Sequence, residues 1–167
     1  MGASFELMTE PLRQGLAPVM ADGARVLILG SFPSERSLAT GEYYANRRNQ
    51  FWGLLGAVLG FDPDLPYDGR ISAVTQHGVA LWDVVHSCRR AGSMDAKIDR
   101  NSLVVNDFGW LLTAHPGIER VFVNGLTAFE LFERHVETAL PFTRLPSSSG
   151  ALPMTFADKL ARWRAVG

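Results

Sequence analysis

The sequence predicts a single domain of the α/β class, and two observations carry that prediction. Short, continuous apolar runs end in polar or glycine-rich turns, which is typical of strands buried on both faces of a parallel sheet. Segments with apolar residues three and four positions apart lie between these runs, as expected for helices that cover such a sheet. With 167 residues, 47% of them hydrophobic and 20% charged, we expect one domain over residues 1–167, with residues 1–24 as an N-terminal lead-in.

The first strand is expected at residues 26–29, because the run Val-Leu-Ile-Leu stops at Gly30. Residues 79–85 and 121–123 have the same apolar character, and each precedes a polar turn. Residues 142–145, just before a proline, form a weaker fourth candidate. Strands that alternate with helical segments predict the α/β class.

A helix is expected at residues 51–59, where five apolar residues occupy positions i, i+3, i+4, i+7 and i+8. Residues 129–136 repeat this spacing more loosely, and residues 102–114 suggest another helix. A C-terminal helix with Pro153 in its first turn is marked by Phe156, Leu160 and Trp163. Residues 62–69 predict a turn-rich, acidic surface connection.

The charge balance argues against a protein that binds nucleic acid mainly through bulk positive charge. Sixteen basic residues, fourteen Arg and two Lys, stand against seventeen acidic residues, so the formal net charge is −1. The charges are unevenly spread: residues 25–52 hold four Arg against two Glu, and residues 144–167 hold four basic residues against one Asp. Any nucleic-acid binding should therefore rest on few phosphate contacts and depend only weakly on salt.

The single cysteine, Cys88, excludes an internal disulfide framework, a four-cysteine zinc site and an iron–sulfur cluster held by cysteines. It also favours a reducing compartment. The longest strongly apolar stretch, residues 54–60, is far shorter than the ~20 residues of a membrane span. We expect a cytoplasmic protein without a signal peptide, because the first twenty residues are interrupted by Glu6, Glu10 and Arg13.

Ligands of open parallel α/β sheets bind outside the carboxyl ends of the strands. In this chain the rule selects residues 30–37, 82–90, 124–125 and 145–150. Serines in the first and last of these segments could hold a phosphate through hydroxyl and backbone N–H groups, although ordinary α/β loops also contain such residues. Neither the GxxxxGK[ST] nor the GxGxxG motif of the common phosphate cofactors is present.

Residues 43–52, which read YYANRRNQFW, are the most unusual stretch of the chain. Aromatic side chains beside Arg in a loop at the ligand edge suit recognition of a planar base by stacking, with guanidinium groups available to phosphates. An Asn carboxamide there can bond to the edge of a base or orient a water, although it is too weak a base to remove a proton. Trp52 opens the expected helix, and for this residue we favour a core position.

Other hydrolytic constellations do not assemble. The four His residues lack the spacing of a zinc protease or a zinc deaminase. A serine hydrolase built on Ser34 lacks the GxSxG elbow. His86 follows a strand, but a lone His is more often structural. Asp83 is the better polar candidate, with a capping or turn carboxylate as its alternative interpretation.

Five segments carry a family resemblance: GSFPSERS, YYANRRNQFW, LWDVV, VNG and LPSSSG, in this order over about residues 25–152. The ordered set resembles the uracil-DNA glycosylase superfamily. The form YYA…RNxFW and the stretch GSMDAKI at residues 92–98 look most like its hypoxanthine-DNA glycosylase branch. The resemblance implies a three-layer α/β/α domain with a central parallel four-stranded sheet, no metal or other cofactor, and a base flipped out of duplex DNA into a pocket at the strand ends.

The resemblance also implies residue roles. Phe32 stands where other branches have the Asn that positions the attacking water, and the branch that this chain resembles uses the Asn of RNxFW, here Asn49. We therefore expect Asn49 to be catalytic. The residues expected to bind the base are Ser31, Phe32, Tyr44, Phe51 and Asn124. The residues expected to hold the DNA are Ser34, Arg47, Arg48, Ser147, Ser148, Ser149, Gly150 and Leu152.

Residues 151–154 would supply the apolar wedge that fills the vacated stack. The expected reaction is hydrolysis of the N-glycosidic bond of 2′-deoxyinosine in damaged DNA, by a monomer in the cytoplasm of a bacterial-type cell, on the nucleoid. A uracil or mismatch-specific glycosylase is the nearest alternative. A catalytically silent DNA-binding module of the same fold is an alternative of another class.

Overall fold

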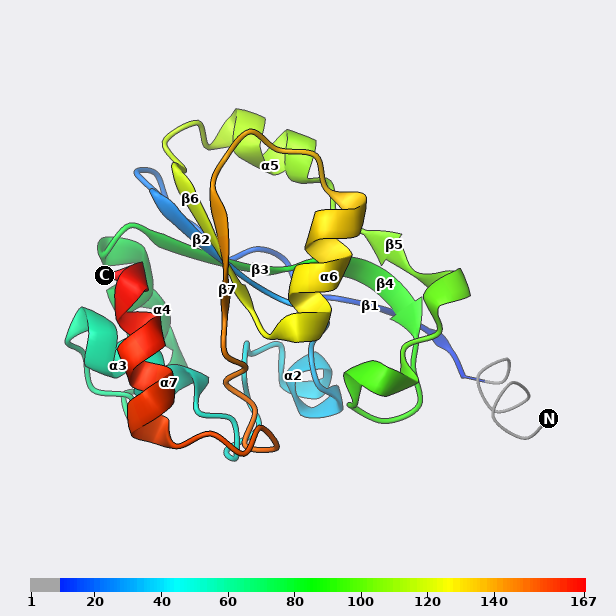
Figure 1. The fold of residues 1–167 in the computed structure, drawn as a ribbon, viewed down its shortest axis with the longest axis horizontal. Helices are drawn as coiled ribbons and strands as arrows, with labels where there is room; N and C mark the ends of the chain where they lie inside the picture. The colour runs from blue at the N-terminus through cyan, green and yellow to red at the C-terminus, as the bar shows by residue number, and fades with distance from the viewer. Residues whose placement is uncertain (1–9) are drawn as a thin grey trace.

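The computed structural model describes residues 10–167, so residues 1–9 of the expected lead-in lie outside the described part of the chain. Its centre is a parallel sheet with the strand order β3-β2-β6-β7 (Figure 1). The strands are β2 (Val26–Gly30), β3 (Val79–Asp83), β6 (Arg120–Asn124) and β7 (Phe142–Leu145). The predicted α/β class and the parallel four-stranded sheet are confirmed.

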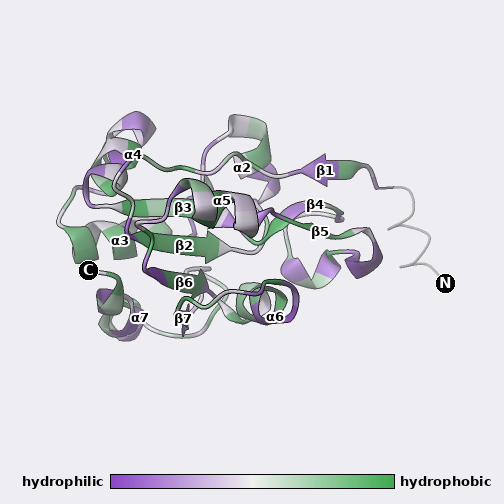
Figure 2. Cartoon of the chain, turned by 90° about the horizontal axis from the view of Figure 1, so that it is seen from above, coloured by the Kyte–Doolittle hydropathy of each residue, from purple (hydrophilic) through white to green (hydrophobic). Residues whose placement is uncertain are grey.

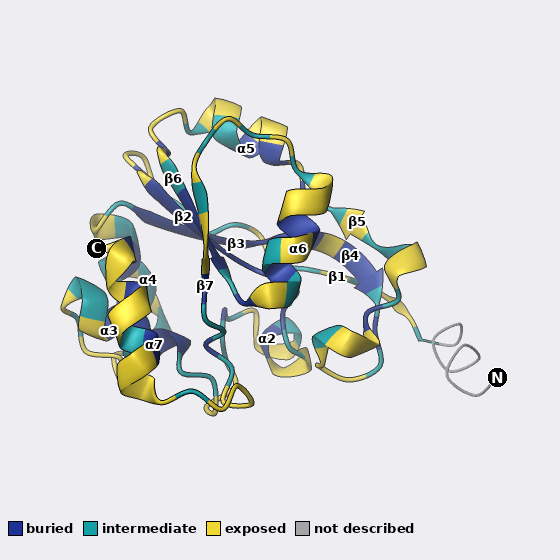
Figure 3. Ribbon diagram, in the orientation of Figure 1, coloured by how far each residue is buried: buried dark blue, intermediate teal, exposed yellow. Residues whose placement is uncertain are grey.

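Side chains of the sheet alternate between two hydrophobic layers. On β2, Leu27 and Leu29 join one layer, whereas Val26 and Ile28 join the other. The first layer is completed by α5 (Phe108–Ala114) and α6 (Leu126–His135). The second is completed by α3 (Phe51–Leu59), α4 (Tyr67–Gln76) and α7 (Phe156–Trp163). Because both faces of the sheet are covered, the inner strand β2 is apolar (Figure 2) and buried (Figure 3) along its whole length.

One expected strand is divided between two sheets. The parallel strand β3 ends at Asp83, whereas residues 79–85 were predicted as one strand. The chain then enters β4 (Val85–Arg89), which pairs antiparallel with β1 (Leu12–Gln14) and β5 (Val104–Val105). No sequence pattern predicts this second sheet, because its outer strands are only two and three residues long and show no period-two pattern.

Two helices begin later in the chain than predicted. Residues 102–114 are α-helical only from Phe108, because the Asp107 carboxylate caps the helix by accepting the Trp110 N–H at 2.9 Å. The C-terminal helix begins at Phe156 and is capped by the Thr155 hydroxyl, so Pro153 lies ahead of the first turn rather than within it.

The remaining helices follow the sequence pattern closely or were missed. The helix at residues 51–59 is confirmed as α3, and the helix predicted at residues 129–136 is α6, which begins three residues earlier. Among the α-helices of residues 10–167, two were not predicted: α2 (Glu35–Thr40) and α4, which starts inside the expected acidic connection. Within residues 10–167, none of the helices combines the length and the apolar character that crossing a bilayer needs.

Candidate functional site

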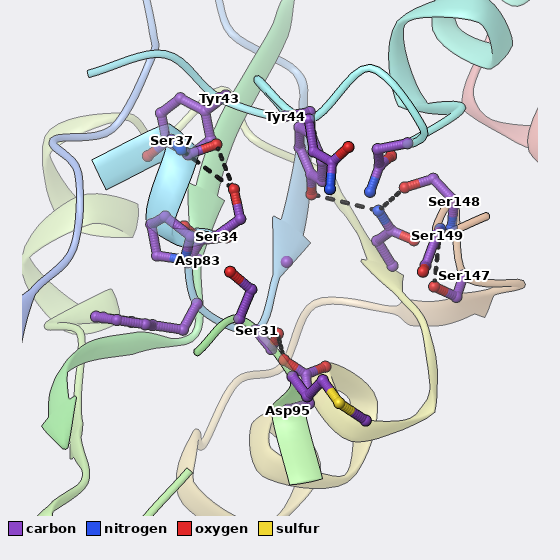
Figure 4. A pocket seen from close by; sticks show the side chains of 18 of the residues that line it. Ser31, Ser34, Ser37, Tyr43, Tyr44, Asp83, Asp95, Ser147, Ser148 and Ser149 are labelled. Carbon is purple, nitrogen blue, oxygen red and sulfur yellow. Dashed lines mark hydrogen bonds between the residues drawn. The ribbon is translucent and has the colours of Figure 1, made fainter. Parts of the chain in front are cut away.

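A cavity of about 420 Å³ opens at the edge where the parallel strands end (Figure 4). This is the edge at which open α/β sheets bind their ligands, and the volume is in the range of small-molecule sites. The lining comes from segments far apart in the chain, namely residues 30–37, 43–49, 93–96 and 147–151, together with Asp83 and Asn124.

The structure brings most of the predicted site residues to this cavity. Those that line it are Ser31, Phe32, Ser34, Tyr44, Asn49, Asn124, Ser147, Ser148 and Ser149. Arg47, Arg48, Gly150 and Leu152 lie outside the lining, in the segments that continue from it, and Arg47 and Arg48 are exposed.

Phe51 corrects one expectation, because it does not face the cavity. Its side chain is 0% exposed and stacks behind the Tyr44 ring, with ring centroids 3.8 Å apart and planes 10° from parallel. Phe51 can therefore support a bound base only through Tyr44. Tyr44 itself has a φ of 53°, in the left-handed region that side chains rarely adopt, so the fold holds this ring in place against backbone strain. Burial raises the pKa of the Tyr44 phenol, which keeps the hydroxyl protonated.

Asn49 lines the cavity from the turn that precedes α3. Its Oδ1 accepts the Phe51 backbone N–H at 3.0 Å, and its own backbone N–H donates to the Asn46 carbonyl at 2.9 Å. The carboxamide is therefore fixed in orientation at the helix start, as a turn Asn often is. Oδ1 keeps a second lone pair, and Nδ2 keeps its hydrogens, for a ligand or a water.

The residues 147–149 and Asn124 form what we term the serine wall of the cavity. Asn124 Oδ1 accepts the Ser148 N–H at 2.9 Å, while Asn124 Nδ2 donates to Ser148 Oγ at 2.8 Å and to Tyr44 Oη at 3.3 Å. Both hydrogens of the amide are thus used inside the protein. The contact of Asn124 with a base edge stays a prediction, and it would require the longer bond to Tyr44 to give way.

The serine wall is anchored from behind by a lysine that the sequence analysis missed. Lys159 is 0% exposed, and its Nζ donates to the Ser149 carbonyl at 2.9 Å and to Gln50 Oε1 at 2.7 Å. Burial lowers the pKa of this ammonium group. The Gln50 backbone N–H also donates to the Ser148 carbonyl at 2.8 Å. The only sequence signal was that Lys159 lies four positions before Trp163, on the same helix face.

Ser31, Asp83 and Asp95 form the opposite side, which we term the acidic wall. Ser31 Oγ donates to Asp95 Oδ1 at 2.7 Å (Figure 4). Burial raises the pKa of the Asp95 carboxyl, although the Ser31 hydrogen bond opposes that shift. Asp83 is 5% exposed, and burial, reinforced by the charge of Asp95, raises the pKa of its carboxyl to about 7. Asp83 was a candidate from the sequence, because it lies near the end of a predicted strand, whereas no sequence pattern indicated Asp95.

Gly30 leaves room for the polar groups of Asp83 and Tyr44. A Cβ at this position would lie 2.5 Å from Asp83 Oδ1 and 2.8 Å from Tyr44 Oη, closer than side chains tolerate. The glycine at the end of the first strand is therefore required by close approach of these polar groups and not by a positive φ.

Arg90 holds the loop after β2 against residues 92–96. Its Nη2 donates to the Pro33 carbonyl at 2.6 Å and its Nε to the Gly92 carbonyl at 2.8 Å. The guanidinium, 4% exposed, lies 5.0 Å from the centroid of the Phe32 ring. Phe32 is therefore held from behind by a cation–π contact while it lines the cavity.

A second groove, of about 680 Å³, shares Tyr43, Tyr44, Asn46 and Asn49 with the cavity. Arg36, Arg47 and Arg70 line it, against Glu42 and Asp64. Between residues 10 and 167 the one ion pair is Arg25–Glu119, so these three guanidinium groups have no carboxylate partner within the described structure. The groove suits a backbone phosphate next to the cavity.

The comparisons with known proteins agree with this geometry. A family model of the uracil DNA glycosylase superfamily matches residues 17–166. A Methanosarcina acetivorans protein named hypoxanthine DNA glycosylase is 32% identical over 156 residues, covering 93% of this chain and 98% of the relative. A protein of the same name from Methanosarcina barkeri is 33% identical over 156 residues, covering 90% of this chain and 95% of the relative.

The structural comparison points the same way. A solution NMR structure from Methanosarcina acetivorans, described as a candidate uracil DNA glycosylase, superposes with a TM-score of 0.79 and 32% identity. It covers 93% of this chain and 96% of its own. Within residues 10–167, His, Cys, Asp and Glu side chains nowhere gather in threes as a metal site would need. The expected absence of a metal stays a prediction.

Proposed function

The chain belongs to the uracil DNA glycosylase superfamily and is a DNA glycosylase that acts on deaminated bases, and we propose that its principal substrate is 2′-deoxyinosine in DNA. The observation that carries this proposal is a cavity at the strand ends that is lined by a fixed Asn carboxamide and by a tyrosine ring stacked on the core. An enzyme that extrudes a nucleotide from a duplex needs such a pocket for the flipped base.

The flipped purine stacks against aromatic faces of the cavity. Tyr44 is held by Phe51 behind it, and Phe32 is held by Arg90. Stacking of a base on an aromatic ring stabilises binding by about 1–3 kcal/mol. Residues 151–154 remain the predicted wedge, and Leu152 among them is 36% exposed, so an apolar side chain is available to fill the gap that the flipped base leaves in the stack.

Asn49 orients the attacking water. The C1′–N9 bond breaks with its electron pair moving to the base, and the water oxygen then bonds to C1′. One water proton leaves to solvent and one proton returns to the base, so the products are hypoxanthine and an abasic sugar. Because the bond breaks before the water attacks, no strong base is required, and an amide oxygen that accepts a hydrogen bond from the water is sufficient.

The serine wall and the second groove hold the backbone. Ser147 and Ser149 offer hydroxyls to phosphate oxygens, since Ser148 is turned inward to Asn124. Arg47 and Arg36 line the neighbouring groove and remain free of carboxylates within residues 10–167. Neutral hydroxyls with few guanidinium groups suit a near-neutral protein.

Single-turnover assays on matched duplexes test the proposal. Duplexes that contain deoxyinosine, uracil, xanthine or ethenocytosine at one position are incubated with excess protein, and abasic sites are cleaved and counted. Fastest release from deoxyinosine is the expected result. Faster release of uracil would assign the protein to uracil or mismatch repair, and binding of the lesion duplex without any abasic product would make it a DNA-binding module.

A further inference from the structure

Asp83 is a buried carboxyl group that the mechanism above does not use. It is the last residue of β3, lies beside Gly30 in the sheet register, and lines the cavity. The residue is 5% exposed, and its Oδ2 is buried without a hydrogen-bond partner within residues 10–167. The Asn106 amide donates to the backbone carbonyl of Asp83, at 2.7 Å, and not to its carboxyl group. A capping or turn carboxylate would have its oxygens hydrogen-bonded, so the structure does not support that role.

The surroundings of Asp83 favour the uncharged acid. The titratable and charged groups that act on it are Asp95 from the 93–97 segment, Arg90 just after β4, and the phenols Tyr43 and Tyr44. Arg90 donates hydrogen bonds to the carbonyls of Pro33 and Gly92, and it forms no ion pair with Asp83. A buried carboxylate without a hydrogen-bonded cation is unstable relative to its protonated form. Seating a base in the cavity would remove still more water from it.

We propose that Asp83 acts as a neutral carboxylic acid that donates a hydrogen bond to O6 of the flipped base and stabilises the negative charge that the base acquires as it leaves. This inference rests on the proposed function. The acid offers one donor and one acceptor, which match the O6 and N1–H edge of hypoxanthine. An ionised carboxylate at the same place would repel a leaving anion, whereas a donor placed where charge develops lowers the barrier.

Two substitutions separate this role from a structural one. Asp83→Asn keeps the shape and supplies an N–H donor that does not titrate, whereas Asp83→Ala removes the donor. Single-turnover release of hypoxanthine is measured for the wild type and both variants from pH 5.5 to pH 9. The wild-type rate should fall as pH rises through neutrality, approaching tenfold per pH unit. Asp83→Asn should lack that decline. A titration of the substrate itself would appear in the pH profiles of both proteins, so the difference between the profiles reports on Asp83.

The size of the loss and its dependence on O6 complete the test. Asp83→Ala should lose 100-fold or more at pH 6, and thermal unfolding of each variant shows that it is folded. On a duplex with deoxynebularine, which lacks O6, the wild type and Asp83→Ala should differ by less than tenfold. A wild-type rate in Asp83→Ala, or the same decline above neutral pH in Asp83→Asn, would overturn the inference while leaving hypoxanthine release intact. No release by the wild type would instead overturn the proposed function.

Discussion

The serine wall and the acidic wall of the cavity differ in how completely their polar groups are hydrogen-bonded. In the serine wall, both ends of the Asn124 amide, the Ser148 hydroxyl and the Lys159 ammonium have partners between 2.7 and 3.3 Å. In the acidic wall, Asp83 Oδ2 is buried without a partner among the described residues, as is Nη1 of the neighbouring Arg90. A network in which every polar group is hydrogen-bonded is rigid. A network with an unpartnered buried group lowers the stability of the fold and leaves that group available to bind a ligand.

Substituting Asn49, which lines the cavity, should have the largest effect. We expect Asn49→Ala to slow single-turnover release of hypoxanthine by about 10²–10³-fold, the usual loss when one oriented polar group is removed from an active site. Asn46→Ala is the matched control, because its Oδ1 accepts the Arg48 N–H at 3.0 Å in the same loop and it also lines the cavity. Equal losses in both variants would assign the effect to loop structure and not to the water.

Asp83→Asn should stabilise the protein, in keeping with the penalty carried by the acidic wall. The folded-state pKa of Asp83 is raised from 3.8 to about 7, so the unfolded chain ionises first and stability is lost as pH rises between these values. The gain from Asp83→Asn should therefore be absent near pH 3.5 and reach at most about 4 kcal/mol above pH 7. Urea unfolding at several pH values measures it, with Asp22→Asn, at an exposed position, as the control.

Asn124→Ala should have the opposite effect on stability, because it removes hydrogen bonds from the serine wall. The Ser148 N–H and Oγ lose their partner, and we expect the free energy of unfolding to fall by about 1–3 kcal/mol. Asn101→Ala, at an exposed position, should change it by less than about 0.5 kcal/mol. An unchanged free energy of unfolding in Asn124→Ala would contradict the rigid-frame interpretation.

Arg47→Gln should have the smallest effect and leave both walls intact. Arg47 is exposed and lines the second groove, where we expect one phosphate contact. Affinity for a lesion duplex should fall a few-fold, and the slope of log affinity against log salt should decrease by about one. Fluorescence anisotropy at four salt concentrations measures the slope, and Arg134→Gln on the distant α6 should leave it unchanged. A wild-type slope of six or more released ions would contradict the expected few contacts.

The elements with strong periodic patterns were predictable, and the short ones were not. The apolar strands β2 and β6 and the striped helix α3 follow from local sequence alone. The small antiparallel sheet, by contrast, depends on pairing between β1 and β4, about 75 residues apart, which no local pattern encodes. The end of β3 at Asp83 was also not predicted, because apolar residues continue through Val84 and Val85 and no local pattern marks the change of sheet.

The candidate site divides along a similar line. The loops at the strand ends and the YYANRRNQFW stretch were visible, since sequence order and the strand-end rule place them together. The burial of Lys159 and Arg90 was not visible, because both are charged residues that sequence analysis assigns to the surface. The position of Phe51 behind Tyr44 also depends on tertiary packing, which decides which of two adjacent aromatic residues faces the cavity.

The strand order β3-β2-β6-β7 has a consequence for folding kinetics. β2 lies between β3 and β6, which begin about 50 and 95 residues later in the chain. The last segment that lines the cavity, residues 147–151, comes later still. Parallel pairings of this sequence separation are slow, because loop-closure entropy must be overcome before the contacts form. During refolding, recovery of activity should lag behind recovery of helical circular dichroism. In that interval the unpaired edges of β2 are exposed to other chains, so refolding yield should fall as protein concentration rises.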